Sequence, residues 1–252
     1  MKIVACVKRV PTTEAQPKVS ADGKSLDAGG LQYMLSFYDE IAVEKAVQVK
    51  EAAGGTPEVI VLSLGPVDGS KEMRECLAKG ADRVVLAKDE QWSTRDARAT
   101  AKALTAQIQK LGANLVLFGR VATDRDNAAV GPMVATWLGW ACVTDVVELT
   151  INGDKGVAKR ESEAGIETYE FALPAVITCQ KGLAEPRYAG LKGIMAAKKK
   201  PLDEVDTTVD ANQAQVNKLE LPPARPAGRI VGTGKEAVAA LMTALRNEAK
   251  VL

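Results

Sequence analysis

Glu58-Val-Ile-Val-Leu-Ser-Leu64 is the stretch that decides the fold, because it is an almost unbroken apolar run. A strand that is apolar at consecutive positions must be covered on both faces, which is typical of a parallel strand inside an α/β sheet. A second apolar run, Lys2–Val7, opens the chain, and Asp39–Glu51 between the two has helical apolar spacing. Beyond the deciding stretch, Ser70–Ala78 is predicted to be a short helix and Arg83–Ala87 a third strand.

The same alternation of strand and helix patterns continues to about residue 140. Ser93 and Asp96 form a capping-box signature at the start of the next helix. The apolar positions of that helix are Ala97, Ala101, Leu104, Ile108 and Leu111. Asn114–Phe118 is the predicted fourth strand, and another helix begins near Asn127 and runs to Trp137. This pattern predicts an α/β fold with a doubly wound, mostly parallel sheet.

The pattern changes after Val143. Short strand patterns joined by turns follow at Val143–Thr150, Gly156–Lys159, Thr168–Leu173 and Ala175–Cys179. Because turns and not helices connect them, these strands are predicted to be antiparallel additions to the sheet.

The last fifty residues have a different character. Lys200–Arg229 has weak periodicity and is rich in proline, at Pro201, Pro222, Pro223 and Pro226. Thr233 and Glu236 form a second capping box, and the closing helix places apolar residues on one face, at Val238, Leu241, Met242 and Leu245. We therefore expect residues 1–200 to form an α/β domain and residues 201–252 an extended arm. Its C-terminal helix would bury its apolar face on the chain's own body or on a partner subunit, and the partner is the interpretation adopted here.

Composition excludes several classes of function. Lys and Arg number 33 against 32 for Asp and Glu, so the net charge of +1 argues against nucleic-acid binding through a basic surface. There is no histidine, which excludes the usual general base and Ser-His nucleophiles, and no CxxC pair suggests a metal site. No apolar run approaches the roughly 20 residues of a membrane span, and the start reads as a strand and not as a signal peptide. The sequence predicts a cytoplasmic protein with no membrane span.

A candidate anion site follows the fourth strand, in Gly119-Arg-Val-Ala-Thr-Asp-Arg-Asp-Asn-Ala-Ala-Val-Gly-Pro-Met133. The loop leads from the carboxyl end of a strand into a helix N-terminus, where free N–H groups and the helix dipole attract a phosphate. Gly131 would let the backbone approach that phosphate, and Arg120 or Arg125 could add a charged contact. The loop matches neither a Walker A nor a GxGxxG pattern, so an ordinary βα loop explains the spacing equally well.

A candidate docking site lies in Glu185-Pro-Arg-Tyr-Ala-Gly-Leu-Lys-Gly-Ile-Met-Ala-Ala-Lys-Lys-Lys200. This charged loop presents an isolated apolar side chain, Leu191, and then continues into a short basic helix. A docking surface needs such a segment, but a solvated helix start that covers the core would have the same pattern.

Five segments in the same order resemble the β (small) subunit of electron transfer flavoproteins. They are the docking segment, the anion loop, Val7–Val10, Cys76–Arg83 and Lys159–Glu167 with its continuation to Thr178. The resemblance covers residues 1–200, whereas residues 201–252 match only in character. It implies a fold of the adenine-nucleotide-hydrolase-like (Rossmann-like) group, in which the first and fourth strands are neighbours.

The resemblance also implies cofactors. AMP would be bound by the β subunit, and FAD would be held mainly by a separate α subunit in a heterodimer. The residues that correspond to the family's nucleotide site and flavin-side aromatic are Cys6, Ser36, Phe37, Tyr38, Asp39, Leu64, Asp124, Asp126, Asn127, Ala128, Ala129, Val130, Gly131 and Ala135. Tyr38 corresponds to an aromatic near the flavin, although core packing would explain it as well.

The implied function is that of an electron carrier, with no catalytic residue and no metal. Electrons would come from acyl-CoA or other flavin dehydrogenases and pass to a quinone oxidoreductase of the respiratory chain. The side chains implied in docking these partners are Arg187, Tyr188, Leu191, Ile194 and Met195.

Two other functions stay open. Val130-Gly131-Pro132 stands where AMP-binding members have Thr-Gly-Gln, and it is similar to electron-bifurcating relatives that hold a second FAD in this pocket. Arg125 and the segment Tyr38–Glu44 fit the AMP-binding group better. A stand-alone nucleotide-binding module of the universal-stress-protein type would share the sheet, but it would lack both the arm and the docking segment.

Overall fold

The computed structural model describes residues 1–225 and 227–252, so Pro226 of the proline-rich arm lies outside the described residues. The chain forms two compact units, Met1–Leu219 and Glu220–Leu252.

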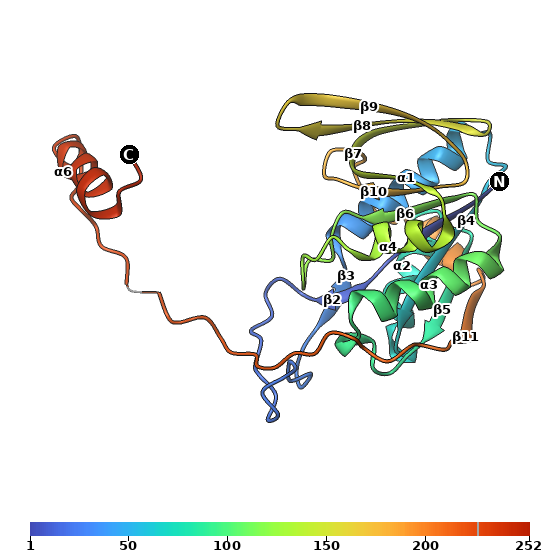
Figure 1. Cartoon of the computed structure of the whole chain (residues 1–252), viewed down its shortest axis with the longest axis horizontal. Helices are drawn as coiled ribbons and strands as arrows, with labels where there is room; N and C mark the ends of the chain where they lie inside the picture. The colour runs from blue at the N-terminus through green and yellow to red at the C-terminus, as the bar shows by residue number, and fades with distance from the viewer. Residues whose placement is uncertain (226) are drawn as a thin grey trace. The chain divides into compact units, whose positions relative to one another are not determined.

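The first unit contains all of the strands and most of the helices (Figure 1). Its strands are β1 (Lys2–Cys6), β2 (Arg9–Pro11), β3 (Tyr33–Leu35), β4 (Glu58–Gly65), β5 (Arg83–Lys88), β6 (Leu115–Gly119), β7 (Ala141–Asn152), β8 (Lys155–Ser162), β9 (Gly165–Ala172), β10 (Ala175–Cys179) and β11 (Leu202–Asp206). Its helices are α1 (Phe37–Ala52), α2 (Ser70–Ala78), α3 (Ala97–Leu111), α4 (Val130–Leu138) and α5 (Leu191–Ala197), with short 3₁₀ turns η1 (Val67–Gly69) and η2 (Trp92–Thr94).

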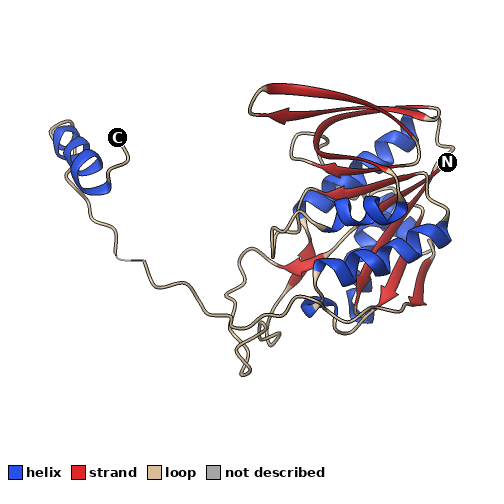
Figure 2. Cartoon of the chain, in the orientation of Figure 1, coloured by secondary structure: helices blue, strands red, loops and turns tan. Residues whose placement is uncertain are grey.

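One large sheet organises this unit, in the order β11-β5-β4-β1-β6-β10-β7-β8-β9. All neighbours from β11 to β7 are parallel, and only the pairs β7–β8 and β8–β9 are antiparallel. Helices lie on both faces of the sheet (Figure 2): α1 and α2 pack on one and α3 and α4 on the other. The predicted α/β class with a doubly wound, mostly parallel sheet is confirmed, as is the expected contact between the first and fourth strands, β1 and β6.

The apolar run that decides the fold is fully covered, as its pattern requires. Along β4, Val59 and Val61 belong to the core cluster under α1 and α2, whereas Ile60 and Leu62 belong to the cluster under α3 and α4. All four have no exposed surface. Alternate residues of one strand therefore support both layers, since side chains alternate between the two faces of a sheet.

The position of β10 differs from the expected antiparallel addition. Ala175–Cys179 lies between β6 and β7 and is parallel to both. All five of its residues are buried, which suits a central strand covered on both faces. The antiparallel part is the meander β7-β8-β9, after which the chain returns to fill the place beside β6.

The first unit also ends later than expected. Leu202–Asp206, which the sequence assigns to the arm, is β11 and pairs in parallel with β5 at the edge of the sheet. The compact unit continues to Leu219, and not to residue 200. Backbone pairing with β5 stabilises this short, acidic segment, whose side chains carry no apolar pattern that would reveal it.

Both capping boxes differ from the expected geometry. Asp96 is itself the N-cap of α3, where its carboxylate accepts a hydrogen bond from Ala99 N at 2.7 Å, and Ser93 belongs to the preceding turn η2. In the second unit, α6 (Ala237–Thr243) continues into a π-helical turn, Ala244–Ala249, and its N-cap Glu236 makes no side-chain capping bond. Val238 and Leu241 on α6 are exposed.

Among the described residues, none of the helices combines the length and the apolar character needed to cross a bilayer.

The central place of β4 is tested by two matched truncations. Ile60→Ala should lower the free energy of unfolding by about 2–5 kcal/mol, because it opens a cavity between the sheet and its covering helices. Ile166→Ala removes the same atoms from β9, where the side chain is 69% exposed, and should cost less than about 0.5 kcal/mol. Urea unfolding of the full chain measures both, and equal losses would contradict the two-layer arrangement.

Candidate functional site

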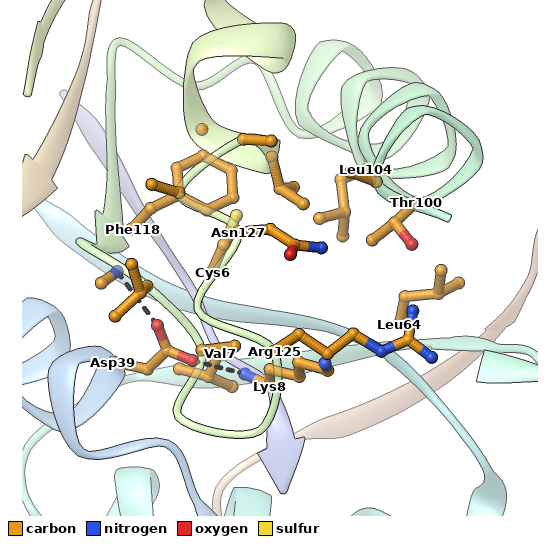
Figure 3. A pocket seen from close by; sticks show the side chains of 18 of the residues that line it. Cys6, Val7, Lys8, Asp39, Leu64, Thr100, Leu104, Phe118, Arg125 and Asn127 are labelled. Carbon is orange, nitrogen blue, oxygen red and sulfur yellow. Dashed lines mark hydrogen bonds between the residues drawn. The ribbon is translucent and has the colours of Figure 1, made fainter. Parts of the chain in front are cut away.

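A cavity of about 120 Å³ that opens to solvent lies at the carboxyl ends of β1, β4 and β6. The close-up in Figure 3 shows side chains from these strands, from the β6–α4 loop and from α3 around it. Since β1 pairs with β4 on one side and β6 on the other, the chain passes to both sides of β1 here. Open α/β sheets bind ligands at this kind of switch point.

The structure brings most of the predicted nucleotide residues to this cavity. Those that line it are Cys6, Asp39, Leu64, Asn127, Ala128, Ala129, Val130 and Gly131. Those that lie outside its lining are Ser36, Phe37, Tyr38, Asp124, Asp126 and Ala135.

Asp39 joins the ends of two strands. Its carboxylate accepts a hydrogen bond from Lys8 N at 2.8 Å, just after β1, and another from Gly119 N at 3.0 Å, at the end of β6 (Figure 3). Burial raises the pKa of the Asp39 carboxyl from 3.8 to about 7, although the two N–H donors lower it. Gly119 is required at this contact, because an added Cβ would lie 2.4 Å from Asp39 Oδ1.

Two of the residues outside the lining support the cavity from behind. Ser36 is fully buried, and its Oγ lies 3.4 Å from both Val121 O and Thr123 N at the start of the β6–α4 loop. Ala135 is buried in the core cluster under α4. Both residues therefore hold the loop and the helix in place and do not reach the cavity.

The two aromatic residues that begin α1 differ in exposure. Tyr38 packs against the core cluster under α1, whereas Phe37 is 42% exposed. The two rings meet edge-to-face with centroids 5.5 Å apart. Core packing thus accounts for Tyr38, and Phe37 is the accessible member of the pair.

The β6–α4 loop has an unusual backbone. Asp126 and Ala128 have φ angles of +55° and +50°, a region that residues with a Cβ seldom adopt. The Lys8 ammonium is ion-paired with Asp124 at 2.6 Å and ties the loop to the end of β1. Strained backbone that is held in place by its surroundings is frequent at ligand sites, which makes this loop a candidate for ligand binding.

Gly131 has a packing reason that the sequence did not reveal. A Cβ at this position would lie 2.9 Å from Thr178 Cγ2 and 3.4 Å from the Phe118 ring. Glycine therefore lets the first turn of α4 lie directly against β6 and β10. The expected close approach of the backbone to a phosphate stays a prediction.

Sequence reasoning missed one wall of the cavity. It consists of residues from η2 and α3, namely Trp92, Arg95, Ala97, Thr100 and Leu104. The sequence places Ala97 and Leu104 on the apolar face of α3. In the structure these two residues also line the cavity. Figure 3 shows Thr100 and Leu104 facing Asn127 across the open space.

Most of the charged side chains that line the cavity are ion-paired. Its lining includes Lys8, Arg95, Arg120 and Arg125 against the single carboxylate of Asp39. The first three are ion-paired with Asp124, Asp89 and Asp145, respectively. Arg125 instead donates to two backbone carbonyls, Arg95 O at 3.0 Å and Ser93 O, so its charge is not neutralised by these contacts. Arg125 is therefore the lining cation that could meet an anionic ligand.

The docking segment is anchored to α1 through Arg187. Its guanidinium donates to Glu44 at 2.8 and 2.9 Å and to Glu51 at 2.7 and 3.0 Å. The hydrogen bonds to Glu51 and Glu44 raise the pKa of Arg187. Arg187, expected to meet a partner directly, therefore fixes the loop to the domain.

The rest of the docking segment exposes apolar side chains, while its backbone is held against the domain. Tyr188 is 98% exposed and Leu191 78%, and Ile194 and Met195 follow Leu191 at helical spacing on α5. An added Cβ on Gly193 would lie 2.3 Å from Ala78 O, so glycine allows α5 to pack on the end of α2. We name the exposed set Tyr188, Leu191, Ile194 and Met195 the docking patch.

A family model described as "Electron transfer flavoprotein domain" matches residues 25–210, well over half of the chain. A curated relative from Bradyrhizobium diazoefficiens, named electron transfer flavoprotein subunit beta, is 38% identical over 253 residues and covers 100% of both chains. This chain belongs to the electron transfer flavoprotein family, as a β subunit.

Other β-subunit relatives agree over the same length. The electron transfer flavoprotein subunit beta of Bacillus subtilis is 34% identical, again with 100% of both chains covered. CarD of Acetobacterium woodii, named a subunit of a caffeyl-CoA reductase-Etf complex, is 34% identical with the same coverage. The family uses a bound flavin to carry electrons, and a β subunit implies an α-subunit partner. A stand-alone universal-stress-protein-like module is therefore set aside.

The buried carboxyl of Asp39 gives a testable pH dependence. Between pH 3.8 and about 7 the folded chain keeps a proton that the unfolded chain releases. This group therefore lowers the free energy of unfolding as pH rises through that window, by at most about 1.4 kcal/mol per pH unit, and adds no slope above it. Urea unfolding between pH 4.5 and 8 should show that the free energy of unfolding of Asp39→Asn lacks this pH-dependent decrease. Parallel plots of the free energy of unfolding against pH for the two proteins would refute the role of Asp39.

Proposed function

We propose that this β subunit binds AMP in the cavity beside Asp39 and forms a heterodimer with an α subunit that holds most of the FAD. The carrier accepts electrons from acyl-CoA or other flavin dehydrogenases in the cytoplasm and passes them to a quinone oxidoreductase. The observation that carries the nucleotide part is the cavity at the carboxyl ends of β1 and β6, which has Arg125 in its lining and lies next to the N-terminus of α4.

The donor set of the cavity suits an adenine nucleotide. Leu64, Leu104, Phe118 and Val130 provide apolar surface for a planar base. The first turn of α4 supplies N–H groups without intrahelical partners, and Arg125 supplies a charge for a phosphate. Asn127 and Thr100 offer polar groups to the open space between these two regions.

The contacts of Arg125 favour AMP over a second FAD. Its two hydrogen bonds join the β6–α4 loop to residues 93 and 95 on the opposite wall of the cavity. A dinucleotide that extended past this point would require the connection to open. The turn Val130-Gly131-Pro132 supports the second candidate, an electron-bifurcating β subunit with FAD in this cavity.

No covalent or acid–base step is assigned to this chain. FAD, when bound, supplies the redox chemistry, and the protein sets its position and surroundings. The exposed Phe37 beside Tyr38 is the aromatic side chain that a flavin held by the α subunit could contact. The closing helix, with Val238 and Leu241 exposed, is suited to pack on that subunit.

The docking patch suits transient contacts with dehydrogenases. Burying one leucine contributes only about 2 kcal/mol, which fits a carrier that must bind, exchange electrons and leave. Arg187 and Gly193 hold the patch on α1 and α2, so little ordering is needed when a partner binds.

The nucleotide content of the purified heterodimer tests the assignment of the cavity. Denaturation should release AMP and FAD in equal amounts, whereas twice as much FAD and no AMP would establish the second candidate.

Arg125→Ala should weaken AMP binding at least about tenfold, because a charge-assisted contact is lost. Full AMP retention in that variant would remove Arg125 from the site.

The docking patch is tested by Leu191→Ala. We expect the apparent affinity for a dehydrogenase to fall about tenfold or more, with flavin content and thermal stability unchanged. Electron transfer measured at limiting carrier concentration gives the affinity. The control is Leu26→Ala, which truncates another exposed leucine, on the loop between β2 and β3. Equal electron-transfer rates for the two variants would contradict the docking role of Leu191.

A further inference from the structure

Residues 207–214, which we name the strap, follow β11 and run beside α3 (Figure 1). They form no helix or strand, yet they are held at both ends by side chains of α3 and the segment before it. At its start, Gln107 donates to Thr207 Oγ1 at 3.2 Å, and Lys102 is ion-paired with Asp210 at 2.6 Å. These contacts lie along the helix and away from the cavity.

The far end of the strap is bound to the segment that begins α3. Asn212 makes two hydrogen bonds there: its Oδ1 accepts from Asp96 N at 3.0 Å, and its Nδ2 donates to Thr94 O at 2.8 Å. Asp96 returns the contact, since its Oδ2 accepts from Gln213 N at 2.6 Å and Ala214 N at 3.0 Å. Its other oxygen caps α3 through Ala99 N. Asp96 thus fixes the strap and the helix start together.

The same short segment is the cavity wall. Trp92, Arg95 and Ala97 line the cavity on either side of the residues that the strap binds. On the cavity side, Arg125 donates to Ser93 O and Arg95 O. Residues 92–97 are therefore held from two directions: the strap binds them from outside and the β6–α4 loop binds them from inside.

We propose that Asn212 and Asp96 are positioning residues for the bound nucleotide, which act by holding the wall at residues 92–97 against the cavity. Neither residue lines the cavity itself. The wall carries no strand pairing, so side-chain contacts fix its position. These are the hydrogen bonds of the strap, those of Arg125, the Arg95–Asp89 ion pair and the contact between the Trp92 and Tyr33 rings. The inference rests on the proposed nucleotide site and extends it to a part of the chain distant in sequence.

The test uses the heterodimer loaded with labelled AMP, whose release is followed after excess unlabelled AMP is added. Asn212→Ala removes both bonds to the wall but leaves the Asp96 cap of α3 in place. We expect release to be about tenfold faster, which corresponds to the loss of one or two hydrogen bonds. Asp210→Ala, the control, removes the ion pairs of the strap with Lys102 and Arg98 and should change release less than about twofold.

A double-mutant cycle separates positioning from general destabilisation. If Asn212 acts through the wall that Arg125 also holds, the double variant should release AMP more slowly than the product of the two single effects predicts. Thermal unfolding should be similar for Asn212→Ala and Asp210→Ala. Equal release rates for those two variants, or independent effects in the cycle, would overturn the proposal.

Amide hydrogen exchange gives a readout that does not require AMP. In Asn212→Ala, the amides of residues 92–99 should exchange faster than in Asp210→Ala. Absence of AMP from the wild-type heterodimer would contradict the proposed function, and exchange would then decide whether the strap holds the wall. Unchanged exchange in Asn212→Ala would overturn the strap as well.

Discussion

The carboxylate of Asp39 is the contact on which the site depends. Strands β1 and β6 are adjacent in the sheet, but their pairing with each other ends at Cys6 and Phe118. Asp39 accepts hydrogen bonds from Lys8 N, two residues after Cys6, and from Gly119 N, one residue after Phe118, and so continues the connection between the two segments. The β6–α4 loop then starts from a defined place, so its strained residues can be held. The cost is a buried carboxyl, which explains why its pKa is raised.

The molecule separates its two proposed tasks by using opposite faces of the sheet. The cavity wall, α3 and α4 belong to one helical layer, while α1, α2 and the docking segment belong to the other. Parallel sheets permit this arrangement because every strand is followed by a return connection that can lie on either face. A partner that binds the docking patch thus need not compete with the nucleotide for the same surface.

The sequence was sufficient for the fold class because β4 is apolar at successive positions, and for most of the cavity because strand ends and helix starts follow from periodicity. It was insufficient wherever position depends on residues far away in the chain. The composition of β10 suits an edge strand and a central strand equally well. Only its pairing with β6 and β7 shows that it is a central one. The cavity wall from Trp92 to Leu104 and the ion pairs of Arg187 were missed for the same reason, since both depend on residues far away in the chain. Arg187 meets Glu44, more than a hundred residues earlier, and no local pattern marks that contact.

Helix α1 packs on the sheet, and it also fixes the distance between the cavity and the docking segment. Asp39 in its first turn belongs to the cavity, while Glu44 and Glu51 farther along hold Arg187 of the docking segment. From Asp39 to Glu51 the helix rises roughly 18 Å, at 1.5 Å per residue. A single inserted residue would rotate one site against the other by about 100°. The length of this one helix therefore sets the spacing and the angle between nucleotide and docking loop, and insertions here should be far less tolerable than in the loops at either end.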